Sequence, residues 1–98
     1  MAAYIIASVE IKNPVDYQEY SKQVPAVIEK YGGKFLVRGG KVEQLEGEWL
    51  PSRMVIMEFE SLEQAKTWYN SPEYQAIIGI RQDNSEGSLV LLEGYSPV

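Results

Sequence analysis

The chain has 98 residues, 45% hydrophobic and 23% charged, which is typical of one globular domain spanning 1–98. It contains no cysteine and no histidine, which excludes disulfides, thiolate nucleophiles, histidine bases and the usual zinc, iron and haem sites, so we expect no metal and no cofactor. The formal net charge is -5 and the nine cations are scattered, which argues against nucleic acid or an anionic membrane as partner.

The N-terminal residues enter a strand pattern directly. Residues 4–11 place Ile5, Ala7 and Val9 on one face and alternate with the other face, as a β-strand does. No basic segment or long apolar run precedes this strand, and no segment is long enough to span a membrane, so we expect a cytoplasmic protein.

A helix is predicted next. Asn13 and Pro14 form an N-cap and first-turn pair, and Gly32 stands where a left-handed C-cap belongs. Between Pro14 and Gly32, apolar residues recur at steps of three and four: Tyr17, Tyr20, Val24, Val27, Ile28 and Tyr31. A strand over 34–38 is predicted after this helix.

In the middle of the chain, the sequence predicts two strands separated by an irregular connection. Gly39 and Gly40 indicate a bulge or sharp turn after the strand 34–38, and a short strand is expected near 42–45. Residues 46–53 read as a connection, and residues 54–60 alternate as a strand.

In the C-terminal part of the chain, the sequence predicts helical segments followed by a strand. Ser61 and Gln64 fit a capping box that begins a second helix. Ser71 and Pro72 restart a helix that we expect to end near 79–81. A surface loop over 82–88 and a strand over 89–95 complete the chain.

The element order is therefore β-α-β-β-α-β, which is the α+β, ferredoxin-like pattern with a four-stranded antiparallel sheet. Helices cover only one face of such a sheet, yet these strands are apolar on both faces. An apolar face of this size is unusual on a monomer. We therefore expect a homodimer in which two copies pack sheet to sheet.

Several stretches carry a resemblance to a known family: "YGGKFLVRGG", "LEGEWLPSRMVIMEFES" and "AKTWYNSPEYQ", with Arg81 and the late "EG". Over roughly residues 4–95 the chain resembles the uncharacterised family catalogued as domain of unknown function 1330. The resemblance implies a dimeric α/β barrel, a superfamily whose paired sheets enclose a space that in various members holds organic substrates or haem. It implies no reaction and no catalytic residues, because the family has no agreed activity.

Arg38 and Arg53 are candidate substrate-binding residues, because each borders an apolar strand. A guanidinium there could clamp a carboxylate or enolate bidentately. It could equally form a structural ion pair, within one chain or across the dimer. The carboxylates considered as partners are Glu46, Glu48 and Glu58.

The remaining candidates also have two interpretations. Glu58 is the acid-base candidate, because burial of a mid-strand carboxylate raises its pKa, although pairing with arginine would oppose that shift. Trp68 and Tyr69 could line a ligand cavity or simply fill the core. Trp49 lies in a connection, where binding residues are frequent.

Two functions therefore stay open. In one, the homodimer binds or converts a small organic acid or an oxygenated aromatic between its paired sheets, without a metal. In the other, it is a non-catalytic dimeric structural or interaction module with no small-molecule ligand. Unpaired arginines beside a pocket of ligand size would favour the first, and paired arginines in a packed interior the second.

Overall fold

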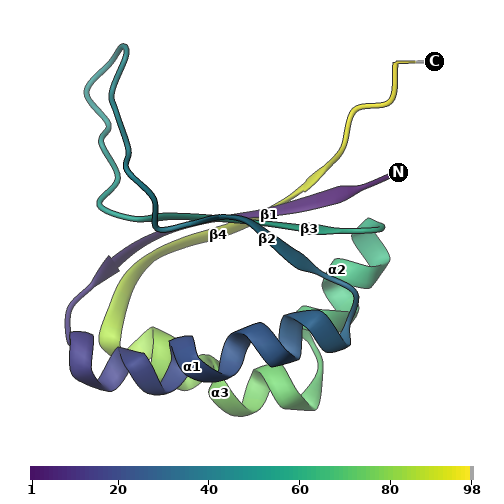
Figure 1. Cartoon of the computed structure of the whole chain (residues 1–98), viewed down its shortest axis with the longest axis horizontal. Coiled ribbons are helices and arrows are strands. Elements are labelled where there is room, and N and C mark those ends of the chain that lie inside the picture. Colours follow the sequence, from purple (N-terminus) through teal and green to yellow (C-terminus); the bar gives the residue numbers. More distant parts are fainter. Residues whose placement is uncertain (98) are drawn as a thin grey trace.

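The computed structural model describes residues 1–97. Its four strands form one antiparallel sheet, and its helices all lie on the same side of that sheet (Figure 1). The elements are β1 (Ala3–Ile11), α1 (Pro14–Lys30), β2 (Lys34–Arg38), β3 (Met54–Phe59), α2 (Leu62–Tyr69), α3 (Pro72–Asn84) and β4 (Ser85–Glu93).

The strand order is β2-β3-β1-β4, with β1 antiparallel to both β3 and β4. This arrangement confirms the predicted ferredoxin-like fold. Helices α1 and α3 lie side by side beneath the sheet, and α2 covers one end (Figure 1).

Helix α1 begins and ends at the residues that the sequence indicates. Pro14 is its first residue, and Gly32 follows it with φ +79°, the left-handed conformation that glycine adopts without strain. Asn13, however, makes no side-chain cap. Its amide donates to Oδ1 of Asn84 at 3.2 Å instead, which joins the start of α1 to the end of α3.

Serine side chains cap the other two helices. Ser61 Oγ accepts from the backbone N–H of Gln64 at 3.0 Å, and Ser71 Oγ accepts from that of Tyr74 at 3.1 Å. The Gln64 side chain does not complete a capping box, because it donates to the backbone carbonyl of Tyr31. It thereby ties α2 to the end of α1.

A polar cluster also joins α1 to α3. The ammonium of Lys30 pairs with Glu73, whose other oxygen accepts from the Tyr31 hydroxyl at 2.8 Å. Hydrogen bonds from Lys30 and then Tyr31 lower the pKa of Glu73 to about 2.

Two local predictions were wrong. Residues 42–45 form no strand, because the segment 40–53 projects away from the sheet and has no strand beside it (Figure 1). Residues 82–88 are not a loop: α3 continues to Asn84 and β4 begins at Ser85, which pairs with Ile11. Of the bulge or sharp turn expected at Gly39 and Gly40, the structure has the turn, with φ +72° at Gly39, and the bulge in β2 lies earlier, between Phe35 and Val37.

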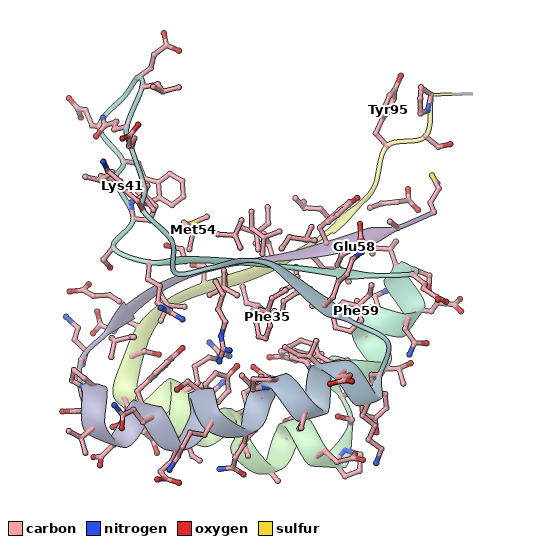
Figure 2. All side chains as sticks on the ribbon, viewed as in Figure 1. Phe35, Lys41, Met54, Glu58, Phe59 and Tyr95 are labelled. Atoms are coloured by element: carbon pink, nitrogen blue, oxygen red, sulfur yellow. The ribbon has the colours of Figure 1, made fainter. Side chains whose placement is uncertain are left out.

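The core fills the layer between the sheet and the helices. Trp68, Tyr74 and Phe59 are its largest fully buried side chains, and truncating such a residue to alanine typically costs about 3–5 kcal/mol. Figure 2 shows Phe35 and Phe59 on this side of the sheet, with Met54 and Glu58 on the other.

The opposite side of the sheet, here called the open face, has no helix over it (Figure 1). Val90 and Leu92 on β4 are 49% and 46% exposed there. The segment 40–53 and the C-terminal residues extend beyond this face on its two sides (Figure 1). The other apolar residues of the open face are Tyr4, Ile6, Val37, Met54 and Ile56.

Candidate functional site

The register shift in β2 decides where Arg38 points. Phe35 is paired with Met57, and Arg38 is paired with Val55. Met57 and Val55 are both buried on the helix side of the sheet. With the extra residue between Phe35 and Val37, Arg38 therefore also lies on the helix side.

Arg53 reaches the same region from the residue before β3, and Gly39 makes room for it. A Cβ built on Gly39 would lie 2.0 Å from Nη1 of Arg53, so no larger residue fits while the guanidinium stays in place. Gly39 also has φ +72°, and its N–H donates to the carbonyl of Met54 at 2.9 Å. One glycine thus turns the chain after β2 and seats the Arg53 side chain.

Arg81, from α3, completes a cluster that we call the arginine pocket. Arg38, Arg53 and Arg81 are the only three arginines of the chain, and all three line this one pocket between the helices and the sheet. Tyr17, Tyr20 and Ser21 of α1 line it with them. Its apolar wall consists of Ala7, Val9, Val24, Ile28, Phe35, Val55, Met57 and Leu89.

The arginine pocket contains positive charge without a protein counterion. Its lining includes no carboxylate, and within residues 1–97 none of the three arginines forms a salt bridge. Nε of Arg53 and Nε of Arg81 are buried and have no hydrogen-bond partner among the described residues. The structural ion pairs considered for Arg38 and Arg53 are therefore absent within this part of the chain.

Arg38 is held at the exposed edge of the pocket. Its Nη2 donates to the backbone carbonyl of Ser21 at 2.7 Å, and its guanidinium carbon lies 4.6 Å from the centre of the Phe35 ring. These two contacts join β2 to α1 and leave the other guanidinium nitrogens for solvent or a ligand.

Tyrosine hydroxyls add hydrogen-bonding groups. Burial, more than any other effect, raises the pKa of Tyr17, while the positive charges of Arg53, Arg81 and Arg38 lower it. Burial and then the neighbouring Tyr74 raise the pKa of Tyr20, whose hydroxyl lies 2.8 Å from that of Tyr74. Both tyrosines are therefore protonated at neutral pH and can donate hydrogen bonds to an anion.

The pocket is small. Its interior admits the centres of water-sized spheres over about 30 Å³, which is enough for a few waters or the head of a small acid. Along α1, Val24 and Ile28 lie beyond Ser21, and along β2, Phe35 lies beyond Arg38. The arginines consequently occupy one end of the pocket, and apolar side chains line the other.

The acid-base candidate Glu58 lies elsewhere. It is on the open face, where its Oε1 is 3.2 Å from Nζ of Lys34 and where it pairs across the sheet with Tyr4. A hydrogen bond to Glu58, followed by its negative charge, raises the pKa of Tyr4. Because the sheet separates Glu58 from the arginine pocket, it cannot exchange a proton with a ligand held there.

The aromatic candidates do not join the arginines either. Trp68 is fully buried, with its ring centre 4.2 Å from that of Tyr74, so it fills the core. Tyr69 borders a different hollow, between α2 and the sheet. Trp49 is 67% exposed on the projecting segment 40–53, beside the open face.

The sequence thus identified two of the three arginines but left open the face of the sheet to which Arg38 points. Any ligand was expected between paired sheets, and the structure shows Arg38 and Arg53 on the helix side of one chain. Arg81 entered only as part of the family resemblance, and Tyr17 only as a core residue. The available signal was that all three arginines of the chain border apolar segments.

Neither a metal cluster nor a membrane-spanning helix is present in the described part of the chain. Within residues 1–97, no cluster of three or more aspartate or glutamate side chains is placed to hold a metal ion. No helix in that part of the chain combines the length and apolarity needed to cross a membrane.

Solved structures share this fold. The RPA0582 protein of unknown function from Rhodopseudomonas palustris is 19% identical, with a TM-score of 0.78 over 98% of this chain and 84% of that one. SnoaB, a cofactor-independent oxygenase from Streptomyces nogalater, is 8% identical, with a TM-score of 0.66 over 99% and 96% of the two chains. A dimeric protein of unknown function with a ferredoxin-like fold from Bacteroides fragilis is 16% identical, with a TM-score of 0.54 over 95% and 96%.

At these identities the similarity establishes the fold alone. A comparison with curated protein sequences finds no match. The family model described as "Domain of unknown function (DUF1330)" matches residues 2–95. That match covers nearly the whole chain, and the chain therefore belongs to the DUF1330 family.

Proposed function

We propose that this protein is a small homodimer that binds a small organic acid in the arginine pocket of each chain. The observation that carries the proposal is the convergence of all three arginines on one pocket that contains no carboxylate. The ligand's acid group would supply the missing negative charge.

The energetic reason is the cost of unpaired charge. Burying a charged group without a partner is unfavourable, and a buried donor without an acceptor costs about 1–3 kcal/mol. Arg53 and Arg81 each have such a donor in Nε. A carboxylate accepts hydrogen bonds from guanidinium groups in a planar, bidentate geometry, which makes it the ligand group that fits best.

Apart from its acid chemistry, the ligand would be short and apolar. The end of the pocket away from the arginines is lined by aliphatic and aromatic side chains, and the enclosed space is only about 30 Å³. This volume favours a small organic acid over the oxygenated aromatic. If the ligand is converted, Tyr17 is the group that would donate a proton, because it lies in the field of all three arginines and Glu58 lies on the other side of the sheet.

Titration calorimetry tests the binding proposal with matched probes. Butyrate and butyramide have nearly the same shape and differ in charge. We expect butyrate to bind the parent and butyramide not to bind. Arg53→Met should weaken butyrate binding. Lys22→Met, which removes one exposed cation 3.0 Å from Glu19 on the surface of α1, should leave it unchanged. Equal binding of acid and amide, or butyrate binding that Arg53→Met leaves unweakened, would contradict the proposal.

The homodimer is proposed from the open face. Its apolar residues include Val90 and Leu92, which are about half exposed in the single chain, and a second copy packed sheet to sheet would cover them. The structure from Bacteroides fragilis, which has the same fold and is dimeric, supports this assembly. The projecting segment 40–53, with Trp49 67% exposed, would then contact the second copy.

Light scattering combined with size-exclusion chromatography tests the dimer. Val90→Asp places a charge on the open face and should yield a monomer. Val15→Asp is the matched control, because Val15 is 78% exposed on α1, on the other side of the molecule. A dimer that persists in Val90→Asp would show that the interface lies elsewhere.

The small volume of the arginine pocket is also consistent with the second function, a non-catalytic dimeric module. A dimeric module without a ligand would explain why the enclosed space is so limited. On that account neither butyrate nor any other short acid would bind, and the arginines would serve only solubility or assembly. The calorimetric comparison separates the two functions.

A further inference from the structure

Resting on the proposed function, we infer that the natural ligand of the arginine pocket carries two acidic groups, so that it is a short dianion such as a dicarboxylate. The observation is that two separate guanidinium groups, those of Arg53 and Arg81, each present a buried and unpartnered Nε. They come from different elements, the start of β3 and the last turns of α3.

The count of charges and donors leads to this ligand class. One carboxylate has two oxygens, so a bidentate pair with one guanidinium uses both and leaves the buried Nε of the other guanidinium without a charged acceptor. Two acidic groups supply two charges and four oxygens. Each of the two buried Nε donors then has its own charged acceptor, and neither has to be shared.

Arg38 is not counted in this pairing. It lies at the exposed edge, where water solvates it, and one of its nitrogens already donates to the Ser21 carbonyl at 2.7 Å. The positive charge of Arg38 would attract the anion, and its side chain would lie over the entrance of the pocket. The tyrosine hydroxyls of the pocket would donate hydrogen bonds to ligand oxygens that the guanidinium groups do not contact. Two buried Nε donors, those of Arg53 and Arg81, therefore remain for the acid groups of the ligand.

The test compares succinate with succinamate by titration calorimetry, above neutral pH and at one fixed ionic strength. The two probes have almost the same size and differ by one charge, and fixed ionic strength removes general screening effects. We expect succinate to bind at least about tenfold more tightly, because a charged hydrogen-bonded pair replaces a neutral one. Malonate and malonamate repeat the comparison at a shorter length.

Arginine variants identify the side chains that cause the preference for succinate over succinamate. Arg81→Met and Arg53→Met should each reduce the ratio of the two affinities to about one, because only one guanidinium with a buried, unpartnered Nε then remains among the described residues. Arg38→Met should weaken both probes by a similar factor and preserve the ratio. Denaturant titration of each variant establishes whether it is folded. If only one of Arg81→Met and Arg53→Met is folded, the affinity ratio measured with that variant is enough for the test.

The outcomes separate this inference from the function on which it rests. Succinamate binding as tightly as succinate, or a preference for succinate that survives both Arg81→Met and Arg53→Met, would overturn the dianion and leave acid binding standing. If no acid of either charge binds the parent, the proposed function itself fails and this inference fails with it.

Discussion

Replacing Arg53 with methionine should stabilise the protein in the absence of ligand. Methionine keeps an unbranched apolar stem of similar reach and removes the guanidinium. In the parent, that guanidinium has a buried Nε without a partner and shares its pocket with two other arginines. No salt bridge is lost within residues 1–97, because Arg53 forms none there.

The magnitude follows from the buried donor. Relieving an unsatisfied buried donor is worth about 1–3 kcal/mol, and part of this is offset by contacts that the guanidinium makes beside Gly39. We therefore expect a gain of about 1 kcal/mol, which corresponds to a rise in Tm of about 4–8 °C for a domain of this size. Breaking a buried ion pair would instead cost about 3–5 kcal/mol.

Denaturant titration at one fixed protomer concentration measures the difference, since the stability of a dimer depends on concentration. Lys22→Met is the control for the change in net charge and should alter the free energy of unfolding by less than about 0.5 kcal/mol. A loss of about 3 kcal/mol in Arg53→Met would refute the reasoning, because it would mean that the guanidinium is paired in the folded protein.

Three further predictions follow from single contacts. Gly39→Ala should lower the free energy of unfolding by about 1–3 kcal/mol, because φ at Gly39 is +72°, and should weaken acid binding, because a Cβ would meet the Arg53 guanidinium. Gly40→Ala is the control: a Cβ there has nothing within 4 Å, so denaturant titration and calorimetry should show unchanged stability and unchanged acid binding. Tyr20→Phe should cost about 1–3 kcal/mol in denaturant titration by leaving the hydroxyl partner buried without an acceptor, whereas Tyr95→Phe, at a residue 88% exposed, should change nothing measurable. The pKa of Glu73 is lowered in the folded state from 4.5 to about 2, so its contribution to stability is present above pH 4.5 and is lost as the pH falls toward 2. Glu73→Gln should therefore lose stability near neutral pH and show a shallower fall of the unfolding free energy across that interval; identical pH profiles for parent and variant would contradict this assignment.

The fold could be predicted because its signals are local. Alternation along β1, the proline and glycine that limit α1, and the serine caps of α2 and α3 each act within a few residues. The faces of the sheet followed from the same alternation. Where the prediction was wrong, the deciding interaction was distant: the pairing of Ser85 with Ile11 extends β4 over residues that read as a loop.

The site could be predicted only in part, for a related reason. The direction of Arg38 depends on one extra residue between Phe35 and Val37, and nothing in that apolar run identifies where the register shifts. Arg81 lies more than forty residues from Arg38 along the chain, and only the packing of α3 against α1 brings them to one pocket. Glu58 lies on the open face, as the alternation along its strand predicts, and it is the helix-side position of the arginines that separates it from them.

The central claim is that the three arginines bind an organic anion together, and their small number makes it directly measurable. Because the chain has only Arg38, Arg53 and Arg81, a nitrogen-15 NMR spectrum should contain three side-chain Nε–Hε signals. We predict that adding succinate shifts or protects all three, with the two buried signals changing most and succinamide changing none. Signals of Arg53 and Arg81 that stay unchanged at saturating succinate would contradict the claim.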